Sequence, residues 1–202
     1  MILALDTSTS ACSAALFDDG GGCIARRDEL IGRGHAERLA PMLAELLDGR
    51  PAGSILVGTG PGSFTGLRVG IAAAHGLAIG WGAELFGMSS LALLAASSGI
   101  EGDLAAAMNG GHGELFVQQF DSALRPVSAL LNLAPAAASE AISADSVAGP
   151  GARTLVDARG YGTAIEAWPS ASQALKLPRE LRTLAASPVY ARAPDAKIGS
   201  AA

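Results

Sequence analysis

Short apolar runs separated by polar turns open the chain and predict three successive β-strands. The runs occupy residues 2–5, 11–17 and 23–30. An acidic, hydroxyl-rich loop follows the first run and a glycine-rich turn follows the second. Apolar residues then recur at steps of three and four from Leu39 to Leu47, which is the spacing of an amphipathic helix. A Gly-Arg-Pro-Ala-Gly segment at 49–53 ends that helix.

The rest of the first half alternates between strand and helix patterns. The expected elements are a strand at 54–57, a helix at 67–78, a strand at 84–87 and a helix, capped by Ser89 or Ser90, that ends near residue 97. A Ser-Gly-Ile-Glu-Gly segment at 98–102 is the expected boundary between two lobes.

The second half repeats this order of three strands followed by alternating helices. Strands are expected at 103–108, 114–120 and 127–133, then a helix at 135–141, a strand at 145–148, a second helix, a short strand at 164–167 and a helix at 169–186. The pattern predicts an α/β protein with two β-β-β-α-β-α lobes, residues 1–99 and 100–192, followed by a flexible tail at 193–202.

Composition narrows the class of protein. Half of the residues are hydrophobic and 16 % are charged, which favours a packed globular chain. The net charge of −5 and the presence of only two lysines disfavour strong direct binding to nucleic acid. Cys12 and Cys23 are not expected to pair, the N-terminus lacks a secretory pattern, and no apolar run reaches membrane-spanning length. The expected location is the cytoplasm, without membrane contact.

Residues 58–70, Gly-Thr-Gly-Pro-Gly-Ser-Phe-Thr-Gly-Leu-Arg-Val-Gly, join a predicted strand to a predicted helix. Such a turn directs backbone N–H groups and the positive end of a helix dipole to one place, which suits a phosphate or carboxylate. The P-loop lysine is absent, and Thr65 or Ser63 stands where the dinucleotide motif needs its third glycine. The stretch is either an anion site or simply a tight strand-to-helix turn.

Asp6 ends the first predicted strand and precedes the hydroxyl residues Thr7, Ser8 and Thr9. In a nucleotide-binding fold this carboxylate could hold a hydrated magnesium ion while the hydroxyls donate to phosphate, and a turn or cap is the alternative. Together with the glycine turn, the candidate nucleotide-binding residues are Asp6, Thr7, Ser8, Thr9, Gly60, Pro61 and Gly62. No cofactor is required by the pattern, and weak binding of ATP or ADP with Mg²⁺ is the expected ligand chemistry.

The histidines, His35, His75 and His112, form no metal-binding pattern. His35 opens a helix, but Leu39 stands four residues later, where a second ligand would be needed. A nucleophile elbow and a Ser/His/Asp arrangement are also absent from the sequence pattern. We therefore predict neither a metal site nor a catalytic residue.

Three motifs in the first hundred residues, in this order, resemble the bacterial TsaB (YeaZ) family. They are Ile-Leu-Ala-Leu-Asp-Thr-Ser-Thr at 2–9 with Ala-Cys-Ser at 11–13, His-Ala-Glu-Arg-Leu-Ala-Pro at 35–41, and Gly-Pro-Gly-Ser-Phe-Thr-Gly-Leu-Arg at 60–68. Residues 113–116 and 188–192 resemble the family's Gly-Glu-Val-Tyr and Pro-x-Tyr-x-Arg segments. The family usually has Asp-Ala-Arg where this chain has Asn109-Gly110-Gly111, which weakens polar contacts from that loop.

The resemblance implies a duplicated actin-like (ribonuclease H-like, ASKHA) ATPase fold. It also implies a role in adding threonylcarbamoyl to the tRNA adenosine next to the anticodon. In that system TsaB is the non-catalytic, dimerising partner of TsaD, which carries the metal and the transfer chemistry, and the ATPase TsaE is the third member. A partner of this kind reaches tRNA only through the complex.

Two predicted helices, at 38–47 and 67–79, have apolar or small-residue faces that suit contact with TsaD or with a second copy. The residues predicted to form this interface are Leu39, Met42, Leu43, Leu67, Gly70, Ile71 and Ala74. Packing of the same faces on the sheet is the alternative. The alternative functions are a nucleotide-dependent kinase, a glycoprotease-like (M22) peptidase of the same superfamily, and a nucleotide-sensing module.

Overall fold

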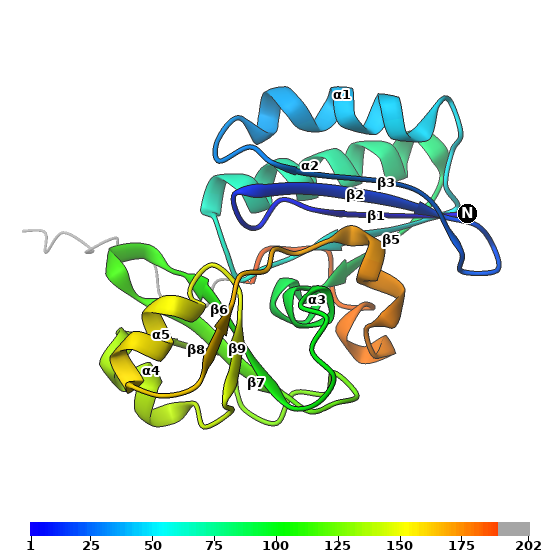
Figure 1. The fold of residues 1–202 in the computed structure, drawn as a ribbon. Helices are drawn as coiled ribbons and strands as arrows, with labels where there is room; N and C mark the ends of the chain where they lie inside the picture. Colours follow the sequence, from blue (N-terminus) through cyan, green and yellow to red (C-terminus); the bar gives the residue numbers. More distant parts are fainter. Residues whose placement is uncertain (190–202) are drawn as a thin grey trace, which may run out of the picture.

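The fold is taken from a computed structural model, which describes residues 1–189. Two five-stranded sheets, one from each half of the chain, form the body of the molecule (Figure 1). The predicted tail at 193–202 and the end of the Pro-Val-Tyr-Ala-Arg motif lie outside the described residues.

The first sheet has the order β3-β2-β1-β4-β5. Its strands are β1 (Ile2–Asp6), β2 (Ala11–Phe17), β3 (Cys23–Leu30), β4 (Ser54–Gly58) and β5 (Glu84–Met88). Helices α1 (His35–Leu47) and α2 (Phe64–Trp81) cover its outer face, and α3 (Ser90–Ser97) follows β5 toward the second sheet (Figure 1). Strand β1 is central, antiparallel to β2 and parallel to β4, so Asp6 ends the middle strand.

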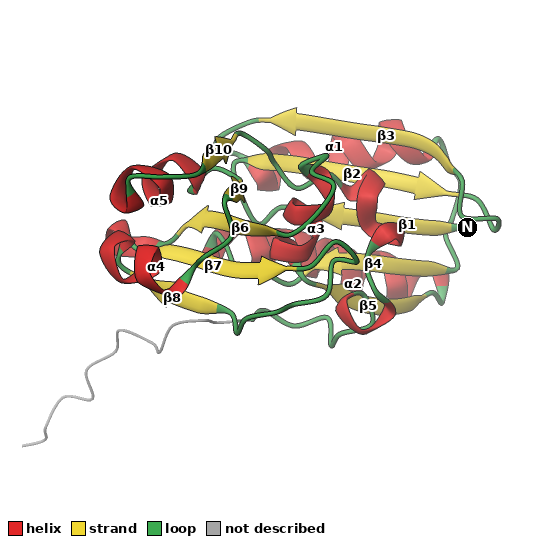
Figure 2. Cartoon of the chain, turned by 60° about the horizontal axis from the view of Figure 1, so that its bottom comes forward, coloured by secondary structure: helices red, strands yellow, loops and turns green. Residues whose placement is uncertain are grey.

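The second sheet has the order β10-β9-β6-β7-β8 (Figure 2). Its strands are β6 (Leu104–Asn109), β7 (Leu115–Phe120), β8 (Leu131–Leu133), β9 (Ser146–Ala148) and β10 (Thr163–Ile165). Helices α4 (Pro135–Ala141) and α5 (Ala152–Arg159) cover one face, and the short turn η1 (Gly111–Gly113) joins β6 to β7. The repeated order of three strands, then helices alternating with strands, is confirmed.

Three apolar layers hold these elements together. One lies between the first sheet and helices α1 and α2, and another lies between the second sheet and helices α4 and α5. The third lies between the two sheets and contains α3, with Phe17 from the first sheet and Phe120 from the second. The two lobes therefore share a core rather than meeting only at a linker.

Residues 167–189, here called the return segment, differ from the prediction. The expected helix at 169–186 is wrong, because the segment contains only the 3-10 turns η2 (Ala171–Lys176) and η3 (Arg179–Leu181) with Pro178 between them. Proline removes a backbone donor and disfavours helix at the preceding residue, so Pro178 disfavours an uninterrupted helix through this position.

The return segment packs on the first lobe, although the predicted boundaries assigned it to the second. Ala174 and Leu177 are buried in the layer between the sheets. Farther along, Leu184 bridges to Gly87 of β5, and the Val189 N–H donates to the Thr59 carbonyl at 2.8 Å. The chain thus ends its described part beside the glycine turn.

The two cysteines lie at different places on the β2–β3 pair. Cys23 faces Phe17 and Cys12 faces Glu29, as the position of the turn predicted, and both thiols are free. Burial raises the pKa of the Cys12 thiol to about 11. Cys12 therefore serves as a small apolar core residue.

Candidate functional site

The Asp6 carboxylate lies at the end of β1 and is only 1 % exposed. Its Oδ1 accepts hydrogen bonds from the Ser8 N–H at 2.9 Å and from Ser8 Oγ at 2.6 Å. Its Oδ2 accepts from Ser90 Oγ at 2.7 Å. Burial raises the pKa of Asp6, and the hydrogen bonds from Ser8 and Ser90 oppose that rise. Both carboxylate oxygens are thus engaged by groups of the chain itself.

Ser90 is the residue of this site that sequence analysis missed, since it was identified only as one of two candidate helix caps. Ser89 is the actual N-cap of α3, and its side chain accepts from the Ala92 N–H. Ser90 Oγ donates to Asp6 and also accepts from the Gly60 N–H at 3.1 Å. It therefore ties β1, the glycine turn and α3 together from a position 84 residues beyond Asp6.

Replacing Ser90 by alanine should destabilise the protein more than replacing its neighbour Ser89. Ser90→Ala leaves a buried carboxylate oxygen and a buried N–H without partners, at a cost of about 2–3 kcal/mol. Ser89→Ala removes a helix cap, which costs about 1 kcal/mol. Urea unfolding of both variants measures the difference. Equal losses of unfolding free energy would show that the Ser90 hydroxyl is not required to satisfy Asp6.

Four glycines spaced by four residues pack against the loop that follows β1. Gly58 abuts the Asp6 carboxylate, Gly62 the Ser8 carbonyl, Gly66 the Thr7 carbonyl and Gly70 the Thr7 hydroxyl. Each contact is so close that a Cβ on the glycine would overlap the neighbouring group. The contacts run from the end of β4 through the turn and along α2. The glycines thus allow the loop at 6–8 to lie directly on the turn and helix.

Two amide groups at the start of α2, those of Ser63 and Gly66, have acceptors within the chain. The Ser63 N–H donates to the Ser8 carbonyl at 2.7 Å, and Ser63 Oγ, the N-cap, accepts from the Gly66 N–H at 3.2 Å. Thr7 Oγ1 donates to the Gly66 carbonyl at 2.7 Å. The Ser63 N–H and the Gly66 carbonyl are therefore used to hold the β1–β2 loop in place.

The structure brings the predicted nucleotide-binding residues together. Residues 6–8 and the turn at 60–62 are in contact through the bonds just described, and the Gly60–Pro61 peptide is cis. Thr9 lies beyond them, where its hydroxyl accepts from the Ala11 N–H at 3.1 Å and its side of the loop faces the cleft between the lobes. These residues lie close together, and the cluster that they form is closed by its own contacts.

The residues predicted to form a partner interface require a correction. All seven are buried within the chain, in the layer between the first sheet and its helices: Leu39, Met42, Leu43, Leu67, Gly70, Ile71 and Ala74. Their apolar faces pack on the sheet, which was the alternative for these helices. Any partner that binds α1 and α2 must therefore contact the opposite faces of these helices.

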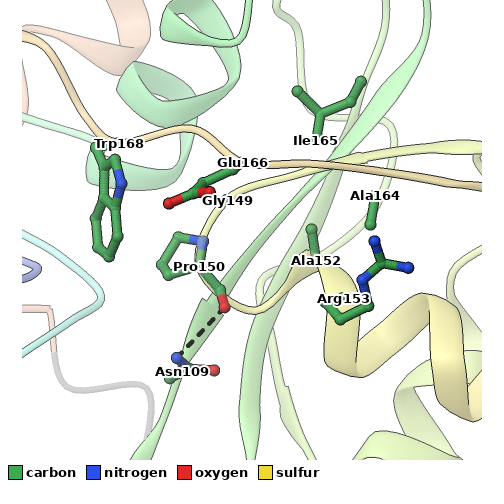
Figure 3. A pocket seen from close by; sticks show the side chains of 9 residues that line it. All are labelled: Asn109, Gly149, Pro150, Ala152, Arg153, Ala164, Ile165, Glu166 and Trp168. Carbon is green, nitrogen blue, oxygen red and sulfur yellow. Dashed lines mark hydrogen bonds between the residues drawn. The ribbon is translucent and has the colours of Figure 1, made fainter.

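A cleft between the lobes contains two adjoining cavities. One, of about 490 Å³, lies between the loop at 8–10, the segment around Arg33, and the β6–β7 turn. The other, of about 330 Å³, lies between the end of β6, the Gly149–Pro150 turn and the residues after β10 (Figure 3). Asn109, Pro150 and Trp168 line both cavities.

The histidines make separate contacts. His35 is buried, with Nε2 3.3 Å from the Ala11 carbonyl, and the His75 Nε2 lies 3.2 Å from the Ala186 carbonyl. His112 stands in the β6–β7 turn with a left-handed backbone. Within residues 1–189, no group of three His, Cys, Asp or Glu side chains is placed to hold a metal ion. None of the helices in that range is long and apolar enough to cross a membrane.

Comparison with known proteins identifies the family. The family described as "TsaD: tRNA N6-adenosine threonylcarbamoyltransferase" matches residues 24–165. The structure is similar to that of YeaZ from Pseudomonas aeruginosa, with a TM-score of 0.77 and 30 % identity, covering 94 % of this chain and 98 % of that one. The chain belongs to the TsaB (YeaZ) family. The two-lobed α/β fold implied by the sequence motifs is confirmed with it.

Curated members of the TsaB family match about half of the chain. The Escherichia coli tRNA threonylcarbamoyladenosine biosynthesis protein TsaB is 41 % identical over 99 residues, which is 46 % of this chain and 42 % of that protein. The TsaB of Haemophilus influenzae is 42 % identical over 99 residues, which is 46 % of this chain and 41 % of that protein. The chain thus spans less than half the length of these curated relatives.

Proposed function

We propose that this chain is the non-catalytic partner subunit of a cytoplasmic complex that adds threonylcarbamoyl to the tRNA adenosine next to the anticodon. Its partners would be the transferase TsaD and the ATPase TsaE, and it would reach tRNA only through them. Membership of the TsaB family and the names of the curated relatives support this role.

The observation that carries the proposal is that both oxygens of the Asp6 carboxylate accept hydrogen bonds from the chain itself. A kinase of this fold would need a free carboxylate for its metal ion and free amides for the phosphates at this place. Here Asp6 is bonded to Ser8 and Ser90, and the Ser63 amide is bonded to the loop after β1. If the purified chain alone hydrolysed ATP at about 1 per second or faster, and Asp6→Ala abolished this, an enzyme would be the better description.

The outward faces of α1 and α2 are the surface that best suits a partner. Both helices lie on the outer side of the first sheet (Figure 1), and the return segment borders α2 beside His75 and Ile79. Small or apolar residues are exposed there: Ala40, Pro41 and Ala44 on α1, and Ala72, Gly76 and Ile79 on α2. Ile79 is 83 % exposed, which is the largest exposure among the large apolar residues described. Small side chains allow a partner helix to approach closely.

We expect Ile79→Glu to abolish co-purification with TsaD while leaving the free energy of unfolding nearly unchanged. A charge at the centre of an apolar contact loses its solvation on binding, and losses of 2 kcal/mol or more, about 30-fold in affinity, are usual there. Val127→Glu is the matched control, because Val127 is also exposed but lies in the second lobe. Unchanged co-purification of Ile79→Glu and of Ala44→Glu would contradict this interface.

A further inference from the structure

We propose that the free edge of β3 binds an extended acidic segment of another protein chain, which joins the first sheet as an additional strand. β3 is the longest described strand and lies at the rim of that sheet, with no strand beyond it (Figure 2). The opposite rim, β5, is bridged by Leu184 of the return segment. This surface is separate from the outward faces of α1 and α2, and the proposal does not depend on the partner role.

The backbone groups on this edge belong to every second residue of β3. At the end of the β2–β3 pair the Ile31 N–H donates to the Ser10 carbonyl at 3.0 Å. In an antiparallel pair, residues bonded to the neighbouring strand alternate with residues whose N–H and C=O face away from it. The register of β2 and β3 therefore turns three residues outward, which are Arg26, Asp28 and Leu30. Their backbone groups are available to an added strand.

The two carboxylates of β3 are engaged within the chain. Asp28 accepts hydrogen bonds from Ser13 Oγ at 2.6 Å and from Ser170 Oγ at 3.1 Å. Glu29, on the opposite face of the strand, accepts from Arg38 Nε at 2.7 Å and from Arg38 Nη2 at 2.5 Å. The negative charges of β3 are therefore directed at β2, the return segment and α1 rather than at the free edge.

The two arginines of β3 have no acidic partner in the described part of the chain. Arg26 and Arg27 are exposed, and Arg27 Nη1 donates to a neutral group, the Arg26 carbonyl, at 3.0 Å. Charged side chains on an edge strand oppose pairing with other chains. Because the charge left unpaired here is positive, the edge rejects basic strands and favours an acidic one. Leu30, which is 62 % exposed, adds an apolar contact at the end of the strand.

A cavity of about 420 Å³ lies between the first half of β3 and the return segment. Arg26 lines it together with Ser172 and Gln173 of η2. A residue directly opposite Arg26 on an added strand has its side chain on the same face of the sheet as Arg26. A carboxylate at that position would therefore lie beside the Arg26 guanidinium and over this cavity. The partner that the edge fits is an extended segment with acidic residues opposite the two arginines and an apolar residue opposite Leu30.

A short peptide tests the proposal with the full chain. The sequence Val-Thr-Thr-Glu-Glu-Thr-Val, aligned antiparallel to β3, places its first valine opposite Leu30 and its glutamates opposite Arg27 and Arg26. We expect saturable binding of the fluorescently labelled peptide, measured by anisotropy. Methylation of the two peptide nitrogens that face β3, opposite Arg26 and Asp28, should weaken binding by about ten-fold or more, because two donors are lost. Methylation of the two nitrogens that face away, opposite Arg27 and Glu29, is the matched control and should have little effect.

Charge reversal at Arg26 tests the acidic preference. Arg26→Glu should weaken binding of this peptide by about five-fold, since an attractive cross-strand pair becomes a repulsive one. A peptide with lysine in place of the second glutamate should bind Arg26→Glu more tightly than it binds the unchanged protein. Arg125→Glu is the matched control, because Arg125 is also exposed but lies in the second lobe, and it should leave both affinities unchanged.

Several outcomes would overturn the proposal. They are equal affinity for the peptide and for its version with two glutamines in place of the glutamates, equal effects of the two methylation patterns, and no saturation in the millimolar range. Sedimentation of the chain alone tests the other occupant of the edge: self-association that Arg26→Glu abolishes would assign the edge to a second copy and overturn the proposal. None of these results bears on co-purification of Ile79→Glu with TsaD, so the two proposals fail independently.

Discussion

Gly66→Ala should destabilise the protein by about 2–3 kcal/mol, whereas Gly76→Ala, ten residues later on the same helix, should stabilise it. A Cβ at Gly66 would overlap the backbone carbonyl of Thr7, which cannot rotate away as a flexible side chain could. The loop after β1 or the start of α2 would have to move, and the bond from Thr7 Oγ1 to the Gly66 carbonyl would be strained. Overpacking of this kind typically costs 1–3 kcal/mol.

Gly76 is the matched control for this prediction. It lies in the middle of α2 with open space around its Cα, so alanine there meets nothing and should gain about 0.5–1 kcal/mol from helix propensity. Urea unfolding should show that the two substitutions change the free energy of unfolding in opposite directions relative to the unchanged protein. A gain for both variants would mean that the loop at 6–8 does not rest on α2 as described.

The order of the elements was predictable because apolar periodicity depends on which face of an element is buried. Strands β1 and β2 are continuous apolar runs that are buried along almost their whole length, and helix α1 buries apolar residues at steps of three and four. All three agree with the sequence prediction. The helix predicted within the return segment was wrong because the alanines of this segment carry little periodic signal. The effect of Pro178 on a helix was also left out of that prediction. Its packing on the first lobe depends on contacts such as Leu184 with Gly87, which no local pattern encodes.

The candidate site shows the same division between local and distant information. Asp6 and the glycine turn were identified because both are local signatures at strand ends. The contacts that close this site depend on Ser90, which is distant from Asp6 in the sequence. They also depend on the glycines spaced by four residues, which the sequence analysis interpreted only as part of a turn. The interface residues were misplaced because amphipathicity identifies the face that is buried and does not say whether a sheet or a partner covers it.

Asp6→Asn should change the pH dependence of stability more than any other single charge removal in the first lobe. Burial raises the pKa of Asp6 in the folded state, so the folded protein binds a proton more tightly than the unfolded chain does. The stabilisation from this group is fully present below the unfolded pKa, near 3.8, and is lost as the pH rises from there through the raised folded pKa. Each unit between the two values corresponds to about 1.4 kcal/mol.

Asparagine keeps the shape of the side chain and one acceptor for Ser8, and it carries no charge that must be buried at neutral pH. The unfolding free energy of Asp6→Asn should therefore increase relative to that of the unchanged protein as the pH rises from about 4 to 8. Asp103→Asn, which removes an exposed carboxylate, controls for net charge and should show no such slope. Urea unfolding at a series of pH values measures the difference between the curves. Parallel curves for Asp6→Asn and the unchanged protein would mean that the Asp6 carboxylate is ionised as readily in the fold as in water, and that Ser8 and Ser90 fully offset its burial.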